Sequence, residues 1–146
     1  MTAASSTRRS VARLIDANAN RALEGLRVCE ELARFHLASL RLFARFRALR
    51  HGVAAAVRAL PLTATDLARA RDATRDPGRR APASRIRSLE RLLLINFQRT
   101  KESLRTLEEC ARVVRPRASS AFQRLRFRTY DLERDTLLAL ATLRHR

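Results

Sequence analysis

The chain has 146 residues, enough for one domain with a sizeable core, and its three glycines and four prolines leave a sequence rich in helix-forming residues. Its 31 basic and 14 acidic residues give a formal net charge of +17, which favours anionic partners such as phosphates or nucleic acids. No run of about 18 apolar residues and no signal peptide is present, so we expect a cytoplasmic protein that does not enter a membrane.

The first part of the chain predicts a pair of helices. Residues 1–9 are small and polar and are expected to be disordered. A first helix should run from about residue 10 to Leu37, because apolar residues recur along it at intervals of three and four. A second helix should run from Ser39 to Leu60, where Pro61 ends it.

Residues 61–83 form the longest stretch without helical periodicity. Thr65 or Asp66 could start one short helical turn, but the rest carries almost no apolar residue. Asp66, Asp72 and Asp76 lie here among several arginines. A long polar loop in a small bundle is either a linker or a functional element, and this composition suits a loop that closes over a metal-bound phosphate.

Two more helices are predicted after the loop, one from Ser84 to about Val114 and one from about Ser119 to Arg144. We therefore predict an all-α fold with a single domain over residues 10–146. Two helix pairs, at about 10–60 and 84–144, would form a four-helix bundle joined by the long polar crossover loop.

An internal repeat supports this architecture. Residues 18–34 read NANRALEGLRVCEELAR and residues 96–112 read NFQRTKESLRTLEECAR, an offset of 78 positions, with nine identical residues of which seven are polar. A repeated apolar stripe would indicate only two amphipathic helices. Because the repeated residues are mostly polar, the sequence predicts a bundle with pseudo-twofold symmetry that presents the same polar groups twice.

The repeated polar residues allow two interpretations. Arg27 with Glu31 and Glu30 with Arg34 have the spacing of ordinary ion pairs within a helix, and the second copy has the same spacing. Another set climbs one side of each helix at intervals of three, beside the apolar face, and either binds a ligand or makes hydrogen bonds between helices. This ladder consists of Asn18, Arg21 and Glu24 in the first copy and Asn96, Arg99 and Glu102 in the second.

Two positions at which the copies differ are also informative. Gly25 stands opposite Ser103, and small side chains at both places indicate the close approach of another helix or of a ligand. Cys29 and Cys110 each stand opposite a leucine of the other copy. A cysteine that replaces leucine behaves as a small buried hydrophobe, so we predict free thiols and neither a disulfide nor a metal site there.

Five stretches, in their order and spacing, resemble one protein family. They are RLIDANANRALEGLRVCEELARF, LRH at 49–51, RDATRDPG at 71–78, the second repeat copy, and FQRLRFRTYDLE at 122–133. The family is the small helical monofunctional hydroxymethylpyrimidine phosphate kinase, a domain also found fused in front of thiamine phosphate synthase. The resemblance implies phosphorylation of hydroxymethylpyrimidine phosphate to the diphosphate with MgATP, in thiamine biosynthesis. Pro77 departs from the family pattern, and because the chain ends soon after the fourth helix we expect no fused synthase domain.

The chemistry of phosphoryl transfer assigns hypothetical roles to individual residues. The reaction needs cations on the phosphates, carboxylates for a metal ion and exclusion of water, and arginine can hold phosphate oxygens with two parallel hydrogen bonds. The candidates for phosphate contacts are Arg21, Arg27, Arg99 and Arg105. The candidates for Mg²⁺ are Asp72 and Asp76, with Glu24 or Glu102 as a further ligand or as the group that orients the attacking phosphate. Asn18 and Asn96 would suit the edge of the pyrimidine.

Two other functions are kept as alternatives. The chain could be a helical binding or regulatory module without chemistry that partners thiamine phosphate synthase. It could also be a basic bundle that binds nucleic acid, but Lys101 is the only lysine, there is one tyrosine and no tryptophan, and no helix-turn-helix pattern occurs. The sequence leaves open whether the bundle forms a homodimer.

Overall fold

The computed structural model describes residues 2–145, and this part of the chain contains helices and no strand. The helices are α1 (Ala3–Phe35), α2 (Leu40–Arg58), α3 (Ala64–Ala70), α4 (Leu89–Val114), a 3-10 turn η1 (Pro116–Ala118) and α5 (Ser119–Arg144). The prediction of an all-α fold is confirmed. None of these helices is both long enough and apolar enough to span a membrane.

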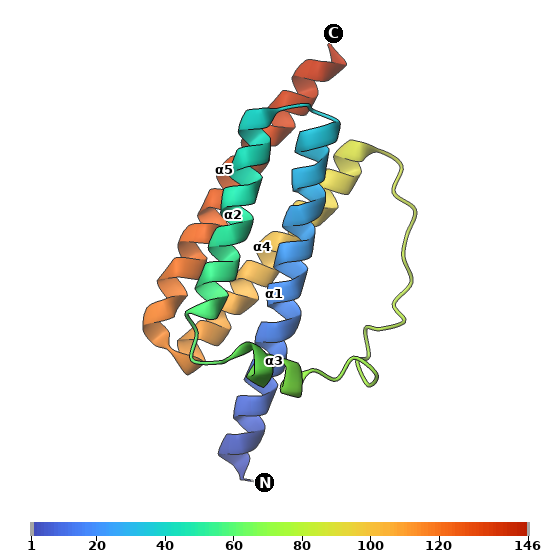
Figure 1. Ribbon diagram of the computed structural model, residues 1–146. Helices are drawn as coiled ribbons and strands as arrows, with labels where there is room; N and C mark the ends of the chain where they lie inside the picture. The colour runs from blue at the N-terminus through green and yellow to red at the C-terminus, as the bar shows by residue number, and fades with distance from the viewer. Residues whose placement is uncertain (1, 146) are drawn as a thin grey trace.

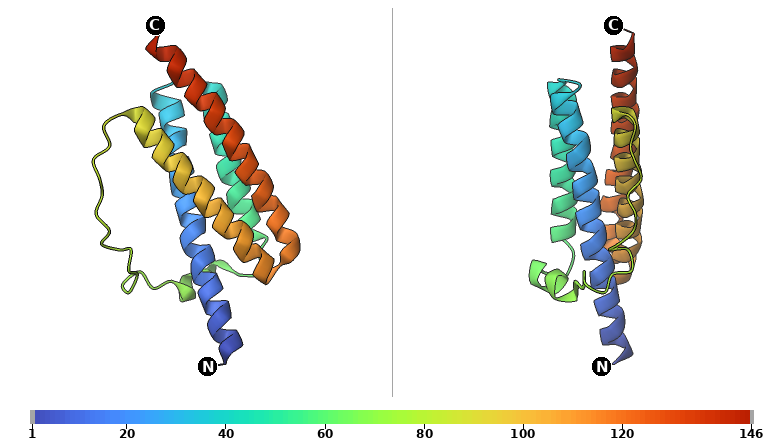
Figure 2. Two further views of the ribbon diagram at one scale, coloured as in Figure 1. Left: turned by 180° about the vertical axis from the view of Figure 1, so that it is seen from behind. Right: turned by 90° about the vertical axis from the view of Figure 1, so that its right-hand side faces the viewer.

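The four long helices form an elongated bundle (Figure 1). Helix α1 packs against α2 and α4, and α5 packs against α4 and α2. The short α3 lies across the N-terminal part of α1, and residues 71–88 then run along the outside of the bundle to the start of α4 (Figures 1 and 2). Each half of the bundle is therefore an antiparallel helix pair, as the repeat predicts.

The core follows from the apolar periodicity of the helices. Phe46, Phe97 and Phe122 are fully buried, and the rings of Phe46 and Phe97 lie with their centroids 5.5 Å apart. Cys29 and Cys110 are buried and free, which confirms the prediction from the repeat. Burial raises the pKa of both thiols, so they stay protonated at neutral pH and behave as apolar groups.

The N-terminus differs from its predicted disorder. Helix α1 begins at Ala3, and the hydroxyl of Thr2 caps it by accepting a hydrogen bond from the backbone N–H of Ser5. The prediction for residues 1–9 is therefore wrong for residues 3–9, while Met1 lies outside the described residues. The reason is that no glycine or proline interrupts the run of alanine, serine and arginine ahead of the first apolar residues, so the helix continues outward from its packed part.

The crossover between the two helix pairs has different ends from those predicted, residues 61–83. Thr63 and Asp66 form a capping box that starts α3, and Ser88 caps α4 by accepting from the N–H of Arg91, so α4 begins at Leu89 and not at Ser84. The start of the crossover is fixed to α1, because the guanidinium of Arg71 donates two hydrogen bonds of 2.8 Å to the carboxylate of Asp16.

Candidate functional site

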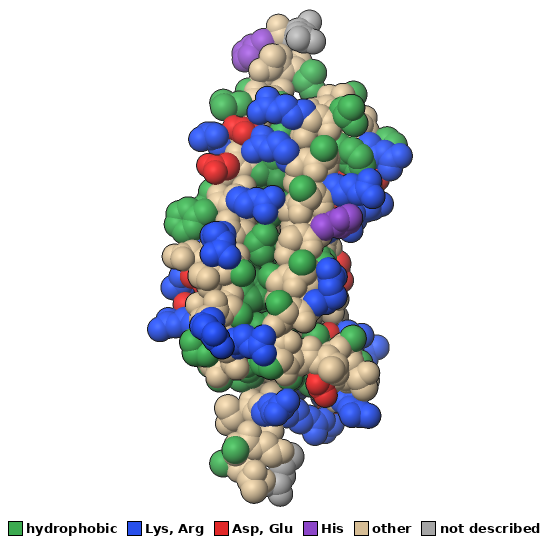
Figure 3. Space-filling model, turned by 60° about the vertical axis from the view of Figure 1, so that its left-hand side comes forward, with side chains coloured by type: hydrophobic (Ala, Val, Ile, Leu, Met, Phe, Trp, Pro, Cys, Tyr) green, Lys and Arg blue, Asp and Glu red, His purple; other side chains and the backbone are tan. Residues whose placement is uncertain are grey.

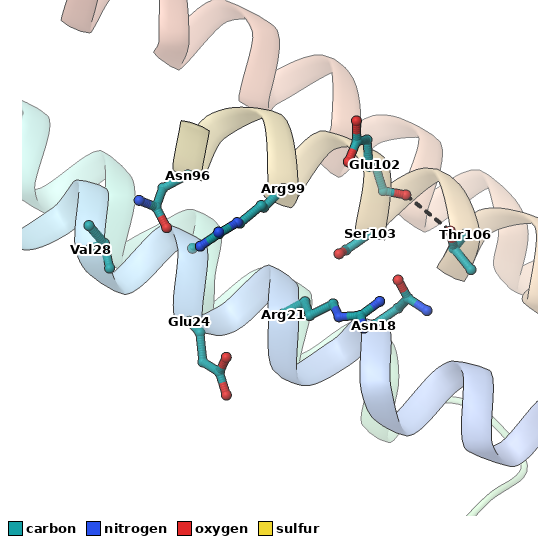
Figure 4. A pocket seen from close by; sticks show the side chains of 10 residues that line it. Asn18, Arg21, Glu24, Val28, Asn96, Arg99, Glu102, Ser103 and Thr106 are labelled. Carbon is teal, nitrogen blue, oxygen red and sulfur yellow. Dashed lines mark hydrogen bonds between the residues drawn. The ribbon is translucent and has the colours of Figure 1, made fainter. Parts of the chain in front are cut away.

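The repeated polar ladder lies in a cleft where α1 and α4 cross. The cleft has a volume of about 730 Å³ and contains both copies of the ladder (Figure 4). Its walls are Asn18, Arg21, Glu24, Gly25 and Val28 from α1, and Asn96, Arg99, Glu102, Ser103 and Thr106 from α4. The ten residues are five pairs related by the repeat offset of 78, so the cleft lies on the pseudo-twofold axis.

The antiparallel crossing gives the cleft two ends. At one end Val28 of α1 lies near Asn96 of α4, and at the other Asn18 lies near Thr106 (Figure 4). We call these the Arg99 half, which consists of Asn96, Arg99, Gly25 and Val28, and the Arg21 half, which consists of Asn18, Arg21, Ser103 and Thr106. Each half takes its asparagine and arginine from one helix and its other two residues from the partner helix.

The two helices approach closely at Gly25. A Cβ atom built there would lie 2.6 Å from Thr100 Oγ1 and 2.9 Å from the carbonyl oxygen of Asn96. These distances are shorter than a side chain tolerates, so the crossing depends on glycine at this position. The sequence expectation that Gly25 marks a close helix approach is therefore confirmed.

The two asparagines are held in the same way. Both are buried, and the side-chain Nδ2 of each donates a 2.9 Å hydrogen bond to a carbonyl one turn earlier, Leu14 for Asn18 and Leu92 for Asn96. With the amide nitrogen so fixed, the side-chain carbonyl oxygen is left as an acceptor beside the cleft. An acceptor of this kind suits an amino group on a ligand ring.

Three of the four charged groups of the ladder are free to meet a ligand, whereas the carboxylate of Glu102 accepts a 2.8 Å hydrogen bond from Nε2 of Gln98. Within residues 2–145, neither guanidinium of Arg21 and Arg99 nor the carboxylate of Glu24 takes part in a hydrogen bond or ion pair, and all three side chains are exposed. Arg21 extends along α1 toward Asn18, and Arg99 extends along α4 toward Asn96 (Figure 4). Unpaired charge gathered in a cleft is what a phosphate site requires.

Arg27 and Arg105, which were predicted phosphate contacts, do not line this cleft. Each makes an ion pair of 3.2 Å with the glutamate four positions later and a hydrogen bond of 3.4 Å to the glutamate three positions later. The inner glutamate of each copy, Glu30 or Glu108, is buried and also receives two hydrogen bonds from an arginine of the adjacent helix. The pairs with the glutamate four positions later are those that the spacing predicts. The predicted pairs of Glu30 with Arg34 and of Glu108 with Arg112 are absent from residues 2–145, because each inner glutamate is paired with the adjacent helix instead.

The predicted metal ligands of the crossover lie outside the cleft. The carboxylate of Asp72 accepts from Nε of Arg75 at 2.7 Å and from the backbone N–H of the same residue, and these bonds lower the pKa of Asp72. The carboxylate of Asp76 accepts from the N–H of Gly78 at 2.8 Å. Both carboxylates are thus engaged in local turns, and in the described conformation the loop does not bring them to Glu24 or Glu102.

The face of the bundle formed by α2 and α5 also carries basic side chains. Over α2 and α5, basic side chains are scattered along both helices with apolar and uncharged groups between them (Figure 3). Nucleic-acid binding normally relies on a continuous basic surface. The nucleic-acid alternative therefore gains no support from this face.

Comparison with known proteins gives the family of this chain. A family model described as the ThiD2 family matches residues 13–135, which is most of the sequence. The chain belongs to the ThiD2 family. No solved structure gives a significant match.

Curated relatives of this ThiD2 chain are longer proteins. It is 40% identical over 126 residues to a thiamine-phosphate synthase of Nostoc sp., 37% over 127 residues to one of Synechocystis sp., and 36% over 141 residues to one of Rhodopirellula baltica. The matches cover 84%, 85% and 94% of this chain but only 34%, 35% and 37% of those relatives. The ThiD2 chain therefore spans about a third of the length of the curated relatives it matches.

The residues of this ThiD2 cleft fit magnesium only as an ion shared with a ligand. Among residues 2–145, no group of three or more histidine, cysteine, aspartate or glutamate side chains could hold a metal. Mg²⁺ in nucleotide sites is usually held by one or two carboxylates together with phosphate oxygens. Glu24 and Glu102 line opposite walls of the cleft, but their carboxylates turn away from each other (Figure 4). An ion bound to phosphate would therefore take one of them as its protein ligand.

Sequence reasoning missed the residues that make the two halves different. Val28 and Thr106 occupy the same position of the repeat, as do Gly25 and Ser103, and only the small size of the second pair was used as a signal. The two members of each pair differ in polarity, and that difference was visible in the aligned copies. Their place in the cleft became apparent only with the helix crossing.

Proposed function

We propose that this chain phosphorylates hydroxymethylpyrimidine phosphate to the diphosphate with MgATP, as a step of thiamine biosynthesis. The observation that carries the proposal is the cleft on the pseudo-twofold axis, where Arg21 and Arg99 are unpaired and stand with two carboxylates and two acceptor amides. Two arginines would supply separate positions for two phosphate groups, and a carboxylate of the cleft would supply a protein ligand for a cation bound to those phosphates. Membership of the ThiD2 family and the names of the relatives support thiamine biosynthesis as the context.

Positioning of the two phosphate groups matters more for this reaction than proton transfer. A phosphate oxygen of the substrate attacks the γ-phosphorus of ATP, a new P–O bond forms, the bond to the β-phosphate oxygen breaks, and ADP leaves. A phosphate monoester is already largely ionised at pH 7, because its second pKa is about 6. The nucleophile therefore needs orientation and relief from repulsion more than a strong base, and paired arginines can provide both.

The residues of the cleft divide these tasks. Arg21 and Arg99 would each hold one phosphate group, and the free oxygens of Asn18 and Asn96 would accept hydrogen bonds from donor groups of the ligands. Magnesium bound with the nucleotide would neutralise charge on the transferred phosphoryl group, and Glu24 or Glu102 would be its ligand from the cleft. The part of Asp72 and Asp76 stays a prediction that requires the crossover loop to move toward the cleft.

The second candidate function is a binding or regulatory module that partners thiamine phosphate synthase. It is favoured by one observation, that this chain matches a third of proteins named thiamine-phosphate synthase. In this case the cleft would bind the pyrimidine phosphate without transferring a phosphoryl group to it.

ADP release by the purified protein distinguishes the two functions. The assay contains Mg²⁺ and ATP with either hydroxymethylpyrimidine phosphate or the unphosphorylated alcohol. ADP release with the phosphate and none with the alcohol is expected from a monofunctional kinase whose cleft holds two phosphate groups. If the phosphate raises the thermal unfolding temperature but no ADP appears, the kinase proposal is wrong and the binding module takes its place.

A further inference from the structure

An apolar groove continues the cleft at the end where Val28 lies. It has a volume of about 480 Å³ and shares Val28 with the cleft. Its other apolar walls are Leu32 and Phe35 of α1 and Leu92 of α4, and the carbonyl of Leu92 also holds the side chain of Asn96. The groove is thus continuous with the Arg99 half.

The repeat shows why the opposite end differs. The positions equivalent to Val28, Leu32 and Phe35 are Thr106, Cys110 and Val113. At the position equivalent to Phe35, the second copy therefore has valine in place of an aromatic residue. Ser103 of the Arg21 half occupies the repeat position that Gly25 occupies in the Arg99 half. Its hydroxyl makes no hydrogen bond within residues 2–145.

We propose that the two halves of the cleft bind different ligands, with the nucleotide in the Arg99 half and the pyrimidine phosphate in the Arg21 half. The purine base of the nucleotide would lie in the apolar groove against Phe35, and its phosphates would reach Arg99. The phosphate of the pyrimidine ligand would bind Arg21 and the hydroxyl of Ser103. This assignment rests on the proposed kinase function and goes beyond it by giving each repeat its own ligand.

The chemistry of the groove fits a purine base. Phe35 is 70% exposed, and the guanidinium of Arg34 lies 4.7 Å from the centroid of its ring, which leaves the other face of the ring for stacking. Besides its apolar residues, the groove is lined by Glu31, whose Oε1 lies 3.2 Å from Nη2 of Arg27 in an ion pair.

The spacing fits a nucleoside triphosphate. Phe35 follows Val28 by seven residues, which is about 10 Å along a helix. A ribose and a phosphate chain can bridge this distance from the groove to the cleft. The pyrimidine phosphate is shorter and needs no apolar extension, which agrees with the polar end around Ser103.

The test measures binding of three probes by titration calorimetry: a non-hydrolysable ATP analogue, inorganic triphosphate and hydroxymethylpyrimidine phosphate. The variants are Phe35→Ala, its repeat counterpart Val113→Ala as control, and Ser103→Ala. Loss of one base-stacking contact should weaken the ATP analogue by about tenfold or more in Phe35→Ala. Inorganic triphosphate and the pyrimidine phosphate should bind this variant as they bind the wild type, and Val113→Ala should bind all three normally.

Ser103→Ala should show the converse pattern, with the pyrimidine phosphate weakened by about tenfold and the ATP analogue unchanged. The assignment of the two halves would be overturned if Phe35→Ala and Val113→Ala weakened binding of the ATP analogue equally. It would also be overturned if Phe35→Ala weakened binding of the pyrimidine phosphate. In either case, ADP release by the wild-type chain would leave the kinase proposal standing. A wild-type chain that binds no ATP analogue and releases no ADP would overturn both.

Discussion

Replacement of Gly25 by alanine probes the helix crossing on which the cleft depends. The new Cβ would meet two atoms that are joined to each other, because Thr100 Oγ1 donates a 2.9 Å hydrogen bond to the carbonyl oxygen of Asn96. Thr100 is fully buried, and the carbonyl belongs to the backbone of α4. Neither atom can move aside without a shift of α4, so α1 and α4 would have to separate.

The expected cost follows from two opposing terms. Overpacking of a tight core contact costs about 1–3 kcal/mol, and alanine in place of glycine inside a helix returns about 1 kcal/mol. Gly52→Ala is the matched control, because a Cβ there would lie 3.0 Å from Leu125 Cδ2, the end of a flexible side chain. The control gains the same helix propensity without the backbone clash.

Urea unfolding followed by far-ultraviolet circular dichroism measures both variants of this pair. We expect Gly25→Ala to have a free energy of unfolding about 1–3 kcal/mol lower than that of Gly52→Ala. If Gly25→Ala were as stable as Gly52→Ala, the close approach of α1 and α4 would not exist in solution as described.

Two further predictions concern ion pairs in the helix pairs. Arg50→Met should lower the free energy of unfolding by about 3–5 kcal/mol, because the carboxylate of Glu30 is only 1% exposed and would lose its 2.7 Å partner. Arg27→Met should cost less than about 1 kcal/mol, because the Arg27 side chain is 53% exposed, its contact with Glu30 is longer at 3.4 Å, and Glu30 keeps Arg50 as a partner. Urea unfolding of both variants compares the two costs. Hydrogen bonding to Arg45 lowers the pKa of Asp135 below its unfolded value of about 3.9. The ionised carboxylate of Asp135 therefore stabilises the folded state above that pH, and this stabilisation is lost as the pH falls through the folded pKa. The stability advantage of the wild type over Asp135→Asn should therefore be seen at pH 7 and vanish at about pH 2, and an advantage that persists in acid would contradict this reasoning.

The fold could be predicted from the sequence because its signals are local. Apolar periodicity predicts the four long helices, and Pro61 and Pro116 mark the ends of two of them. The repeat predicts that the helices form two pairs. The ends of the elements were less accessible, since the choice of Thr63, Ser88 and Thr2 as caps depends on hydrogen bonds that many nearby hydroxyls could make.

The site could be predicted only in part, because one repeat contains two kinds of polar residue. Position on the helix distinguished the ladder beginning at Asn18 from the ion pairs, but Arg27 and Arg105 were included as phosphate contacts since their residue type suits phosphate. The spacing of both arginines also predicts ion pairs with glutamates four positions later, and the structure contains these pairs. The acids of the crossover were chosen by composition, which carries no information on where a loop lies.

The central claim is that phosphoryl transfer takes place in the cleft between α1 and α4. The most direct test compares kcat/KM for hydroxymethylpyrimidine phosphate in Arg99→Ala and in Arg112→Ala, an exposed arginine of the same helix that pairs with Glu109. Loss of a preorganised cationic contact should lower kcat/KM of Arg99→Ala by about a hundredfold or more, with Arg112→Ala near the wild type and both variants equally helical. Equal activity of the two variants would contradict the account.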